Sequence, residues 1–234
     1  MKGVLAAAWV IARKDLVVEA RSRELIYTTL FFAMACVLVF SFSLVSFSLD
    51  PSGKVPDEAQ AGILWVAITF SGSLALGRAF ERERQAETLR ALLLAPVERA
   101  SVYLGKLFSL LVLMAAVEVV LVPVVGLLFG AHIDRAPWLL LGLLAAGTLG
   151  FAAVGTLLAA MLVRAHSRDV LLPILLYPIS VPVILGGVRG TAALFAGNQP
   201  DVDSAQSWLA MLIFFDAVFV TLAFWMFEPV MGEQ

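Results

Sequence analysis

The sequence predicts an all-α integral membrane protein with six transmembrane helices. Of its 234 residues, 61% are hydrophobic and 15% are charged, and the mean hydropathy is +0.96. A soluble domain is far less apolar than this. A bilayer core is crossed by roughly 20 apolar residues in helical conformation. Six stretches meet this requirement: about 25–49, 61–80, 107–130, 137–163, 169–188 and 207–228.

Positive charge in the connecting segments indicates how these spans are oriented. Thirteen of the 16 Lys and Arg residues lie in the N-terminal tail and in the connections 78–106 and 164–168. The other three are Lys54, Arg135 and Arg189. Because cytoplasmic loops carry the excess of Lys and Arg, we expect both termini to be cytoplasmic. We expect residues 1–234 to form a single membrane permease domain.

Aromatic residues near the span ends agree with this topology. Trp and Tyr are enriched at the two membrane–water interfaces. We expect Trp65, Trp138 and Trp208 at the outer interface, and Tyr27, Tyr103 and Trp225 at the inner interface.

Residues 1–24, ahead of the first span, mix apolar and basic residues. The stretch "VLAAAWVIARKDLVVEARSRE" fits an amphipathic helix that lies in the inner interface. In this interpretation Val4, Leu5, Ala8 and Trp9 dip into lipid. The alternative is a basic flank that does no more than enforce the orientation of the first span. We prefer the interfacial helix.

Residues 81–106, between the second and third spans, carry the densest run of charge in the chain. Their charges begin with alternating signs in "ERER", so attraction to anionic lipid would be weak. The run "QAETLRALLLAP" then places Ala86, Leu89 and Leu93 on one helical stripe. Pro96 ends or turns this helix. A short amphipathic helix here would serve as a lid, a surface anchor or a docking element, and a solvated loop is the alternative.

Two carboxylic acids lie inside predicted spans, Glu118 in the third and Asp216 in the sixth. An ionised carboxylate at the bilayer centre costs at least a few kcal/mol, so each should face protein or water, or be protonated. One interpretation is a polar relay or substrate contact. The other is a neutral carboxyl in an interhelical hydrogen bond, which we favour because no intramembrane Lys or Arg is available as a partner.

The fifth span contains three prolines, Pro173, Pro178 and Pro182. Each proline removes one helical hydrogen bond, so the span must kink or loosen. The sequence leaves two interpretations open, a moving element and a static kink that shapes a subunit contact.

Several function classes are excluded by what the sequence lacks. A net charge of −2 argues against nucleic-acid binding. One cysteine and two histidines provide neither a disulfide framework nor a Cys/His metal cluster. The stretch "GSLALGR" has the glycine spacing of a phosphate-binding loop, but Arg78 replaces the lysine and the stretch lies inside a span. We expect a non-catalytic protein that binds no cofactor and no nucleotide itself.

The order of "RKDL" and "RSRE", a span, an outer loop and then "ILWVAITFSGSLALGRAFERERQAETLRALLLAPVERASVYLGK" resembles an exporter-type ABC permease. More narrowly, it resembles the CcmB family, the haem exporter permeases of cytochrome c maturation, over essentially the whole chain. In that family an F-x-x-D-x-x-D-G-S-L pattern in the second cytoplasmic segment is thought to engage the ATPase. Here Phe80 and Leu89 match, Glu83 and Thr88 are conservative replacements, and Ala86 and Glu87 depart from the pattern.

The resemblance implies a cytoplasmic coupling helix within residues 81–106 that docks on a separate ATPase subunit. The implied docking residues are Phe80, Glu83, Glu87, Thr88, Leu89, Arg90 and Leu93. Apolar side chains would supply burial in a groove, and charged ones would set orientation and partner choice.

The resemblance also implies the partners and the location. ATP would be bound by the partner ATPase, and haem would be handled by the complex. Further implied partners are a second permease copy in a homodimer, a haem-handling membrane subunit, a haem chaperone and the lipid bilayer, in a bacterial inner membrane. A haem ligand at His132 is disfavoured, since a histidine in an outer loop is more often solvated.

Two other functions remain open from the sequence. One is an ABC permease that exports a different cargo, such as a lipid, glycan or drug. The other is an ATPase-independent secondary transporter, for which Glu118 and Asp216 are the candidate coupling-ion residues. Inverted repeats would favour the secondary transporter, and the sequence shows none.

Overall fold

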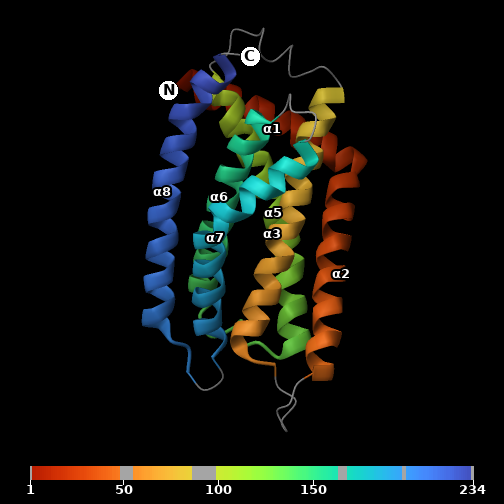
Figure 1. Ribbon diagram of the computed structural model, residues 1–234, viewed down its shortest axis with the longest axis vertical. Helices are drawn as coiled ribbons and strands as arrows, with labels where there is room; N and C mark the ends of the chain where they lie inside the picture. Colours follow the sequence, from red (N-terminus) through yellow and green to blue (C-terminus); the bar gives the residue numbers. More distant parts are fainter. Residues whose placement is uncertain (1, 48–54, 86–98, 163–167, 197–198, 233–234) are drawn as a thin grey trace.

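The computed structural model describes residues 2–47, 55–85, 99–162, 168–196 and 199–232. Within these residues the chain is helical apart from short connections. The helices are α1 (Lys2–Ser22), α2 (Glu24–Phe47), α3 (Asp57–Gln85), α5 (Arg99–Phe129), α6 (Pro137–Met161), α7 (Arg168–Phe195) and α8 (Val202–Gly232). Figure 1 shows α2, α3, α5, α6, α7 and α8 as a bundle and α1 across one end of it.

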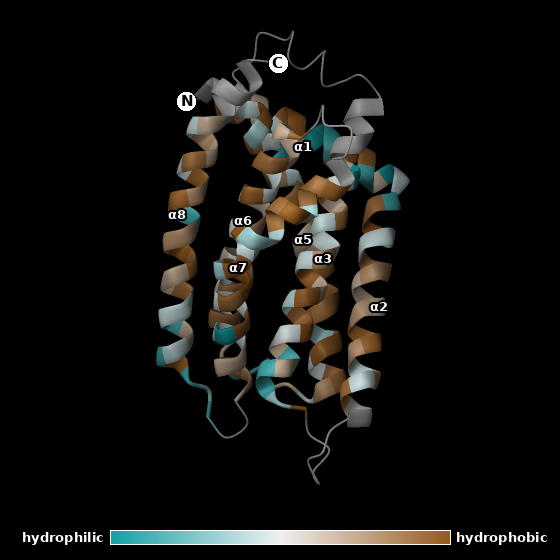
Figure 2. Cartoon of the chain, in the orientation of Figure 1, coloured by the Kyte–Doolittle hydropathy of each residue, from teal (hydrophilic) through white to brown (hydrophobic). Residues whose placement is uncertain are grey.

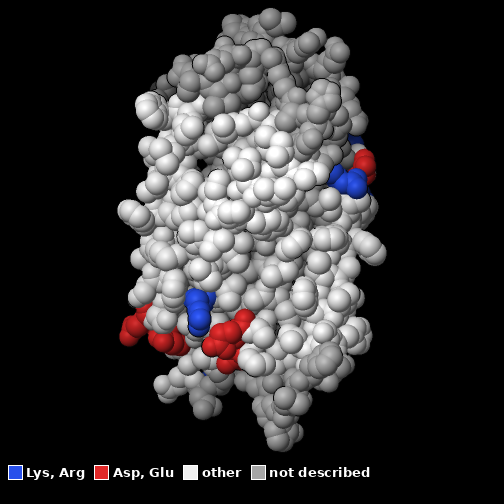
Figure 3. All heavy atoms as spheres, viewed as in Figure 1, with Lys and Arg blue, Asp and Glu red and all other residues white. Residues whose placement is uncertain are grey.

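Within the described residues, six helices are long and apolar enough to cross a membrane. Their apolar parts are Glu24–Leu44, Asp57–Ala79, Ala100–Phe129, Pro137–Met161, Val170–Phe195 and Val202–Met226. Figure 2 shows the apolar residues along these helices, and Figure 3 shows that on this face the charged residues gather toward the ends of the bundle. For the described residues, the predicted all-α class is confirmed, as is the prediction of six helices able to cross a membrane.

Local sequence signals set several helix ends. Pro137 occupies the first turn of α6, where its missing N–H costs no hydrogen bond. Asp201 caps α8, because the backbone N–H of Ser204 donates to its Oδ1 over 3.0 Å. Gly130, directly after α5, has a φ of 68°, a left-handed conformation that glycine adopts without strain. Arg23 joins α1 to α2 and has a φ of 54°.

The middle of the bundle is formed around α6, which packs on α3, α5, α7 and α8. Its small residues allow this close packing. A Cβ on Gly147 of α6 would collide with the ring of Trp65 in α3. A Cβ on Gly155 of α6 would collide with Leu76, which also lies in α3. The core therefore depends on large side chains of α3 set against glycines of α6.

Trp65 lies at the centre of this packing and not on the surface of the bundle. Its side chain is fully buried, and its ring also lies against Gly187 of α7. Its Nε1 donates to Oγ1 of Thr191 over 3.0 Å. The expectation that Trp65 is an outer interfacial anchor is therefore wrong. A Trp near a span end can equally fill a core when glycines face it.

Tyr103 is a second aromatic residue whose side chain is buried in the bundle and does not face outward as an interfacial anchor would. It is fully buried, and its hydroxyl donates to the carbonyl oxygen of Ala153 in α6 over 3.2 Å. By contrast, the side chains of Trp138, Tyr27 and Trp225 are exposed on the bundle surface.

Helix α7 contains all three prolines of the predicted fifth span. Figure 1 shows its first part running obliquely across the bundle before the helix turns to run beside α6 and α8. Pro178 and Pro182 lie on the exposed side of α7, and Pro173 is half-buried. Whether α7 moves during function stays a prediction.

Candidate functional site

The predicted docking segment connects α3 to α5. Helix α3 continues to Gln85, and α5 begins at Arg99. Phe80 and Glu83 lie on the last turns of α3, and their side chains are not among those described. The other predicted docking residues, Glu87, Thr88, Leu89, Arg90 and Leu93, lie outside the described residues. All seven assignments stay predictions, but the structure defines the helix ends that carry the segment.

Helix α1 packs directly on the beginning of α5. A Cβ on Gly105 would lie 2.8 Å from the carbonyl oxygen of Ala8 and 2.9 Å from the Cβ of Ile11. Ala8 is therefore buried against α5, and the expectation that it dips into lipid is wrong. The side chains of Leu5 and Trp9 are 61% and 56% exposed, so they can still contact lipid as predicted. The two sides of α1 thus have different roles, one in packing and one facing outward.

An ion pair holds the same two helices together. Nζ of Lys106 in α5 lies 2.6 Å from Oδ2 of Asp15 in α1. Nζ of Lys14 lies 3.2 Å from Oδ1 of the same carboxylate. The Lys106 side chain is only 6% exposed. An ion pair that is this buried requires its partner, because an isolated buried charge costs several kcal/mol.

Other contacts tie the ends of α3 and α5 to the rest of the bundle. Nη1 of Arg78 in α3 lies 3.6 Å from Oε1 of Glu24 in α2. Deeper in the bundle, a Cβ on Gly72 of α3 would lie 2.6 Å from Cε of Met114 in α5 and 2.9 Å from Cε1 of Phe151 in α6. Helices α3 and α5 are therefore in contact with α1, α2 and α6.

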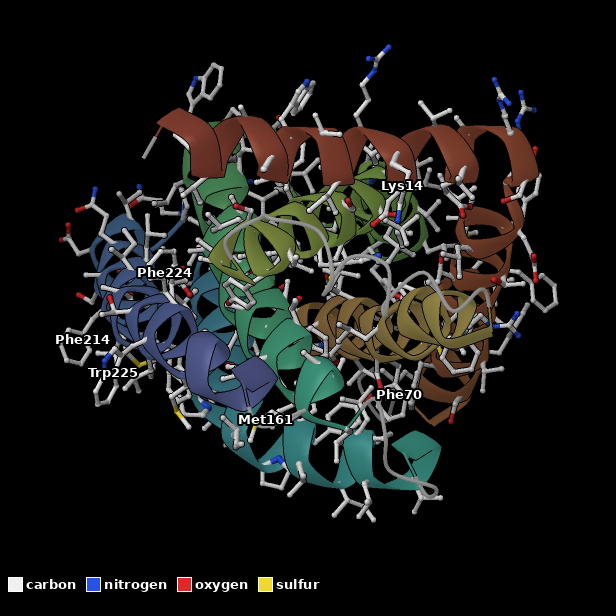
Figure 4. The ribbon with its side chains drawn as sticks, turned by 90° about the horizontal axis from the view of Figure 1, so that it is seen from above. Lys14, Phe70, Met161, Phe214, Phe224 and Trp225 are labelled. Atoms are coloured by element: carbon white, nitrogen blue, oxygen red, sulfur yellow. The ribbon has the colours of Figure 1, made fainter. Side chains whose placement is uncertain are left out.

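A pocket of about 750 Å³ opens between α1, α2, α3 and α5 at this end of the bundle. Figure 4 shows the Lys14 side chain on the side of α1 that faces the bundle. The charged lining residues are Lys14, Asp15, Glu19, Arg23 and Lys106. The apolar lining residues include Leu25, Ile26, Leu76, Leu110, Val112 and Leu113. The sequence alone does not predict this pocket, because its walls come from helices that are far apart along the chain.

The intramembrane carboxyl of Glu118 lies between α5 and α6. Its side chain is buried, and its Oε1 accepts a hydrogen bond from Oγ1 of Thr148 in α6. This contact supports the structural interpretation, in which an interhelical hydrogen bond satisfies the carboxyl.

The carboxyl of Asp216 in α8 lies against α6 and α7. A Cβ on Gly150 would lie 2.5 Å from Oδ1 of Asp216 and 3.0 Å from Cγ2 of Val183. Among the described residues, this Oδ1 is buried and has no hydrogen-bond partner. Gly150 thus makes room for a polar group that sits in an apolar surrounding.

The two carboxyls do not form one site. Their contacts on α6, Thr148 and Gly150, are two residues apart and hence roughly 200° apart around the helix axis. Glu118 and Asp216 therefore approach α6 from opposite sides. This placement does not favour a shared coupling-ion site, which the secondary-transporter interpretation needs.

Candidate metal ligands do not gather in the part of the chain that the structure describes. No group of three or more His, Cys, Asp or Glu side chains is placed to hold a metal ion there. His132 follows α5, with its Nδ1 lying 3.1 Å from the carbonyl oxygen of Gly130. Cys36 is a free, partly buried thiol on α2. His166 lies outside the described residues.

Comparison with known proteins identifies the family. The profile of the family described as "CcmB protein" matches residues 6–229. Three curated relatives carry the name "Heme exporter protein B". The relative from Paracoccus denitrificans is 29% identical over 170 residues, which cover 73% of this chain and 75% of the relative.

The other two relatives come from Rhodobacter capsulatus and Bradyrhizobium diazoefficiens. The first is 28% identical over 147 residues, or 63% of this chain and 67% of the relative. The second is 27% identical over 156 residues, or 66% of this chain and 69% of the relative. The similarity therefore extends over most of both chains in each case.

Proposed function

The chain belongs to the CcmB protein family, and from this membership we propose that it is the permease subunit of an ABC-type complex that serves cytochrome c maturation. The observation that carries the proposal is the family match over residues 6–229, which includes all six apolar helices. The relatives named heme exporter protein B support a membrane component of a haem export system. The complex resides in the bacterial inner membrane.

The energy comes from a separate ATPase subunit that binds and hydrolyses ATP. It docks on the coupling helix within residues 81–106, and two permease copies present two such helices. The physics is that of a helix in a groove, in which leucines supply apolar burial and Glu83, Glu87 and Arg90 set the orientation. The permease itself holds no cofactor.

Motion passes from the ATPase into the membrane through the ends of α3 and α5. The ion pair of Lys106 with Asp15 and the close contact of Gly105 with Ala8 make α1 move with α5. Helix α2 packs along α3 and follows it, and the exposed ion pair of Arg78 with Glu24 joins the same two helices. Packed helices shift as units because their interfaces are close-packed and do not deform continuously.

The output of the complex is haem export or the release of a haem-loaded chaperone on the outer side. A haem-handling membrane subunit and the chaperone are the further partners. We place haem itself on those partners, and the sequence of this chain has no C-x-x-C-H haem-attachment motif.

Co-purification with the ATPase tests the docking step. Glu83→Arg with Glu87→Arg should abolish recovery of the ATPase with the tagged permease. The matched control is Glu58→Arg with Asp134→Arg, which reverses two exposed acids near the opposite end of the bundle and should leave recovery unchanged. Equal recovery with both double variants would contradict the assignment of the docking segment.

The function itself is tested with the purified complex that contains the ATPase, the haem-handling subunit and the chaperone. ATP should release the haem-loaded chaperone, and scrambling residues 83–90 should eliminate that release. A complex that assembles and hydrolyses ATP without any effect on haem would leave an ABC permease for another cargo.

A further inference from the structure

The pocket between α1, α2, α3 and α5 has the two-part chemistry of an amphiphile site. Charged side chains from α1, the α1–α2 junction and α5 form one part, and apolar side chains of α2, α3 and α5 form the other. A pocket of about 750 Å³ falls in the size range of about 300–1,000 Å³ that small-molecule sites occupy. The docking role proposed above does not use this pocket, but the ion pair of Lys106 with Asp15, which couples α1 to α5, is part of its lining.

The charged part of the pocket favours an anion. Its lining has three basic residues, Lys14, Arg23 and Lys106, and two acidic residues, Asp15 and Glu19, so its formal charge is +1. Both acids are engaged within the protein. Asp15 is paired with Lys106 and Lys14, and Oε1 of Glu19 accepts a hydrogen bond from the backbone N–H of Ile26 over 2.9 Å.

The apolar part of the pocket suits a hydrocarbon chain. Leu25 and Ile26 come from the first turn of α2, Leu76 from α3, and Leu110 and Leu113 from α5. All of these side chains are buried or partly buried within the bundle. A hydrocarbon chain lying along them would be removed from water, and its burial would favour binding in proportion to the apolar area covered.

The position of the pocket indicates which amphiphile can reach it. It lies where α1 crosses the ends of the spans, which the distribution of Lys and Arg assigns to the cytoplasmic side. Tyr27 lines the pocket with a side chain that is 59% exposed, as is typical of a residue at a membrane interface. Phospholipids with anionic headgroups are concentrated at such cytoplasmic surfaces.

We propose that this pocket binds an anionic phospholipid of the inner leaflet, with its phosphate near Lys14 and Arg23 and an acyl chain along Leu25, Leu110 and Leu113. The bound lipid connects the α1–α2 junction to α5. It thereby adds to the contact that the ion pair of Lys106 and Asp15 makes between α1 and α5.

Haem is the other anionic amphiphile to consider, and the lining argues against it. Protein haem iron is held by His, Met, Cys or Tyr. Among the described residues that line the pocket there is no His, Met or Cys, and the side chain of Tyr27 is more than half exposed. The pocket matches the charge of a phosphate headgroup better than it matches an iron porphyrin.

Native mass spectrometry of the purified full-length protein tests the site. Phosphatidylglycerol and phosphatidylcholine with identical acyl chains are added in separate titrations. We expect tighter binding of phosphatidylglycerol, because its headgroup carries a net negative charge. Lys14→Gln with Arg23→Gln should weaken that binding about tenfold, since both basic residues nearest the phosphate are then lost. Lys14→Arg with Arg23→Lys keeps both charges and should retain the binding.

The matched control is Arg13→Gln with Arg21→Gln. These arginines lie on α1, are exposed and do not line the pocket, so their loss lowers the net charge equally without altering the site. Retained phosphatidylglycerol binding in this variant supports the site. Equal weakening in both double variants would overturn the proposal, because it would indicate a non-specific surface effect.

A second pair of variants tests the apolar part without changing charge. Ala116 lines the pocket, whereas its neighbour Ala115 is exposed and does not. Ala116→Leu should weaken phosphatidylglycerol binding, and Ala115→Leu should not. Displacement of the lipid by haem at a one-to-one ratio, or equal affinity for both lipids in the unaltered protein, would contradict the proposal.

Discussion

Nζ of Lys106 lies 2.6 Å from Oδ2 of Asp15, so the first helix and the third span share an ion pair close to the predicted ATPase-docking segment. Lys106 is 6% exposed and the Asp15 side chain 20%. The pair is therefore shielded from water on the lysine side and reached by water on the aspartate side. We therefore expect its contribution to the free energy of unfolding to lie between that of a surface ion pair and that of a fully buried one.

Removing one member of this pair should destabilise the protein. Lys106→Met takes one of the two lysines away from Asp15, and Asp15→Asn takes the carboxylate away from a buried ammonium group. Breaking a fully buried pair costs about 3–5 kcal/mol, and we expect less here because Asp15 is partly exposed. Asp15→Asn should lower the Tm in detergent more than Lys106→Met does. In the double variant, strictly additive losses would contradict a direct interaction.

The close approach of α1 to α5 should not tolerate a side chain at position 105. Gly105→Ala places a Cβ within 3 Å of Ala8 and Ile11, so the helices must separate. Overpacking of this kind costs about 1–3 kcal/mol, and we expect a lower Tm and weaker ATPase stimulation in the assembled complex. Gly62→Ala is the control, because a Cβ there meets nothing within 4 Å. A Gly105→Ala variant with unchanged Tm would show that α1 does not pack on α5 in this way.

The core contact of Trp65 with Gly187 predicts a compensating pair of substitutions. A Cβ at position 187 would lie 2.5 Å from Cζ2 of Trp65, so Gly187→Ala should lower the Tm. Trp65→Phe should lower it as well, because Thr191 loses its indole donor. The smaller ring makes room for the methyl group added at position 187, so the double variant should be more stable than the two single losses predict. Gly77→Ala, where a Cβ meets nothing within 4 Å, should show no such coupling with Trp65→Phe.

We expect the intramembrane carboxyls of Glu118 and Asp216 to stabilise the fold and to take no part in transport. Glu118→Gln retains an oxygen that accepts the hydrogen bond of Thr148, so the Tm should change little. Glu118→Leu removes the bond and should cost about 0.6–2 kcal/mol. We expect Glu118→Gln and Asp216→Asn to keep ATP-dependent chaperone release in the complex. Loss of release with an unchanged Tm in either variant would instead favour a polar relay.

The six spans can be predicted from the sequence because length and hydropathy alone determine which helices can cross a bilayer. The helix ends are harder to predict. Hydropathy places the end of the second span near residue 80 and the start of the third near 107, but α3 continues to Gln85 and α5 begins at Arg99. Hydropathy falls where the apolar core ends, whereas a helix continues as long as its backbone hydrogen bonds are satisfied.

Contacts between segments far apart in the chain could not be predicted from the sequence. From the sequence, Lys106 is only one of the basic residues of a predicted cytoplasmic segment, because nothing near it in the chain indicates an ion-pair partner 91 residues earlier. Trp65 resembles an interfacial residue, because its position in the span does not reveal that Gly147 and Gly187 face its ring. The pairing of Glu118 with Thr148 likewise depends on how α5 and α6 are rotated against each other.

The packing of α1 on α5 imposes an order on biosynthesis. Helix α1 leaves the ribosome before α5, its main packing partner, which follows about 90 residues later and takes roughly 5–20 s to be made at ordinary rates of chain elongation. During this interval its buried side, with Ala8 and Ile11, has no protein to cover it. The nascent helix must wait at the membrane surface until α5 has been inserted. Helix α1 thus reaches its final place only after α5, the third of the six spans, has been made.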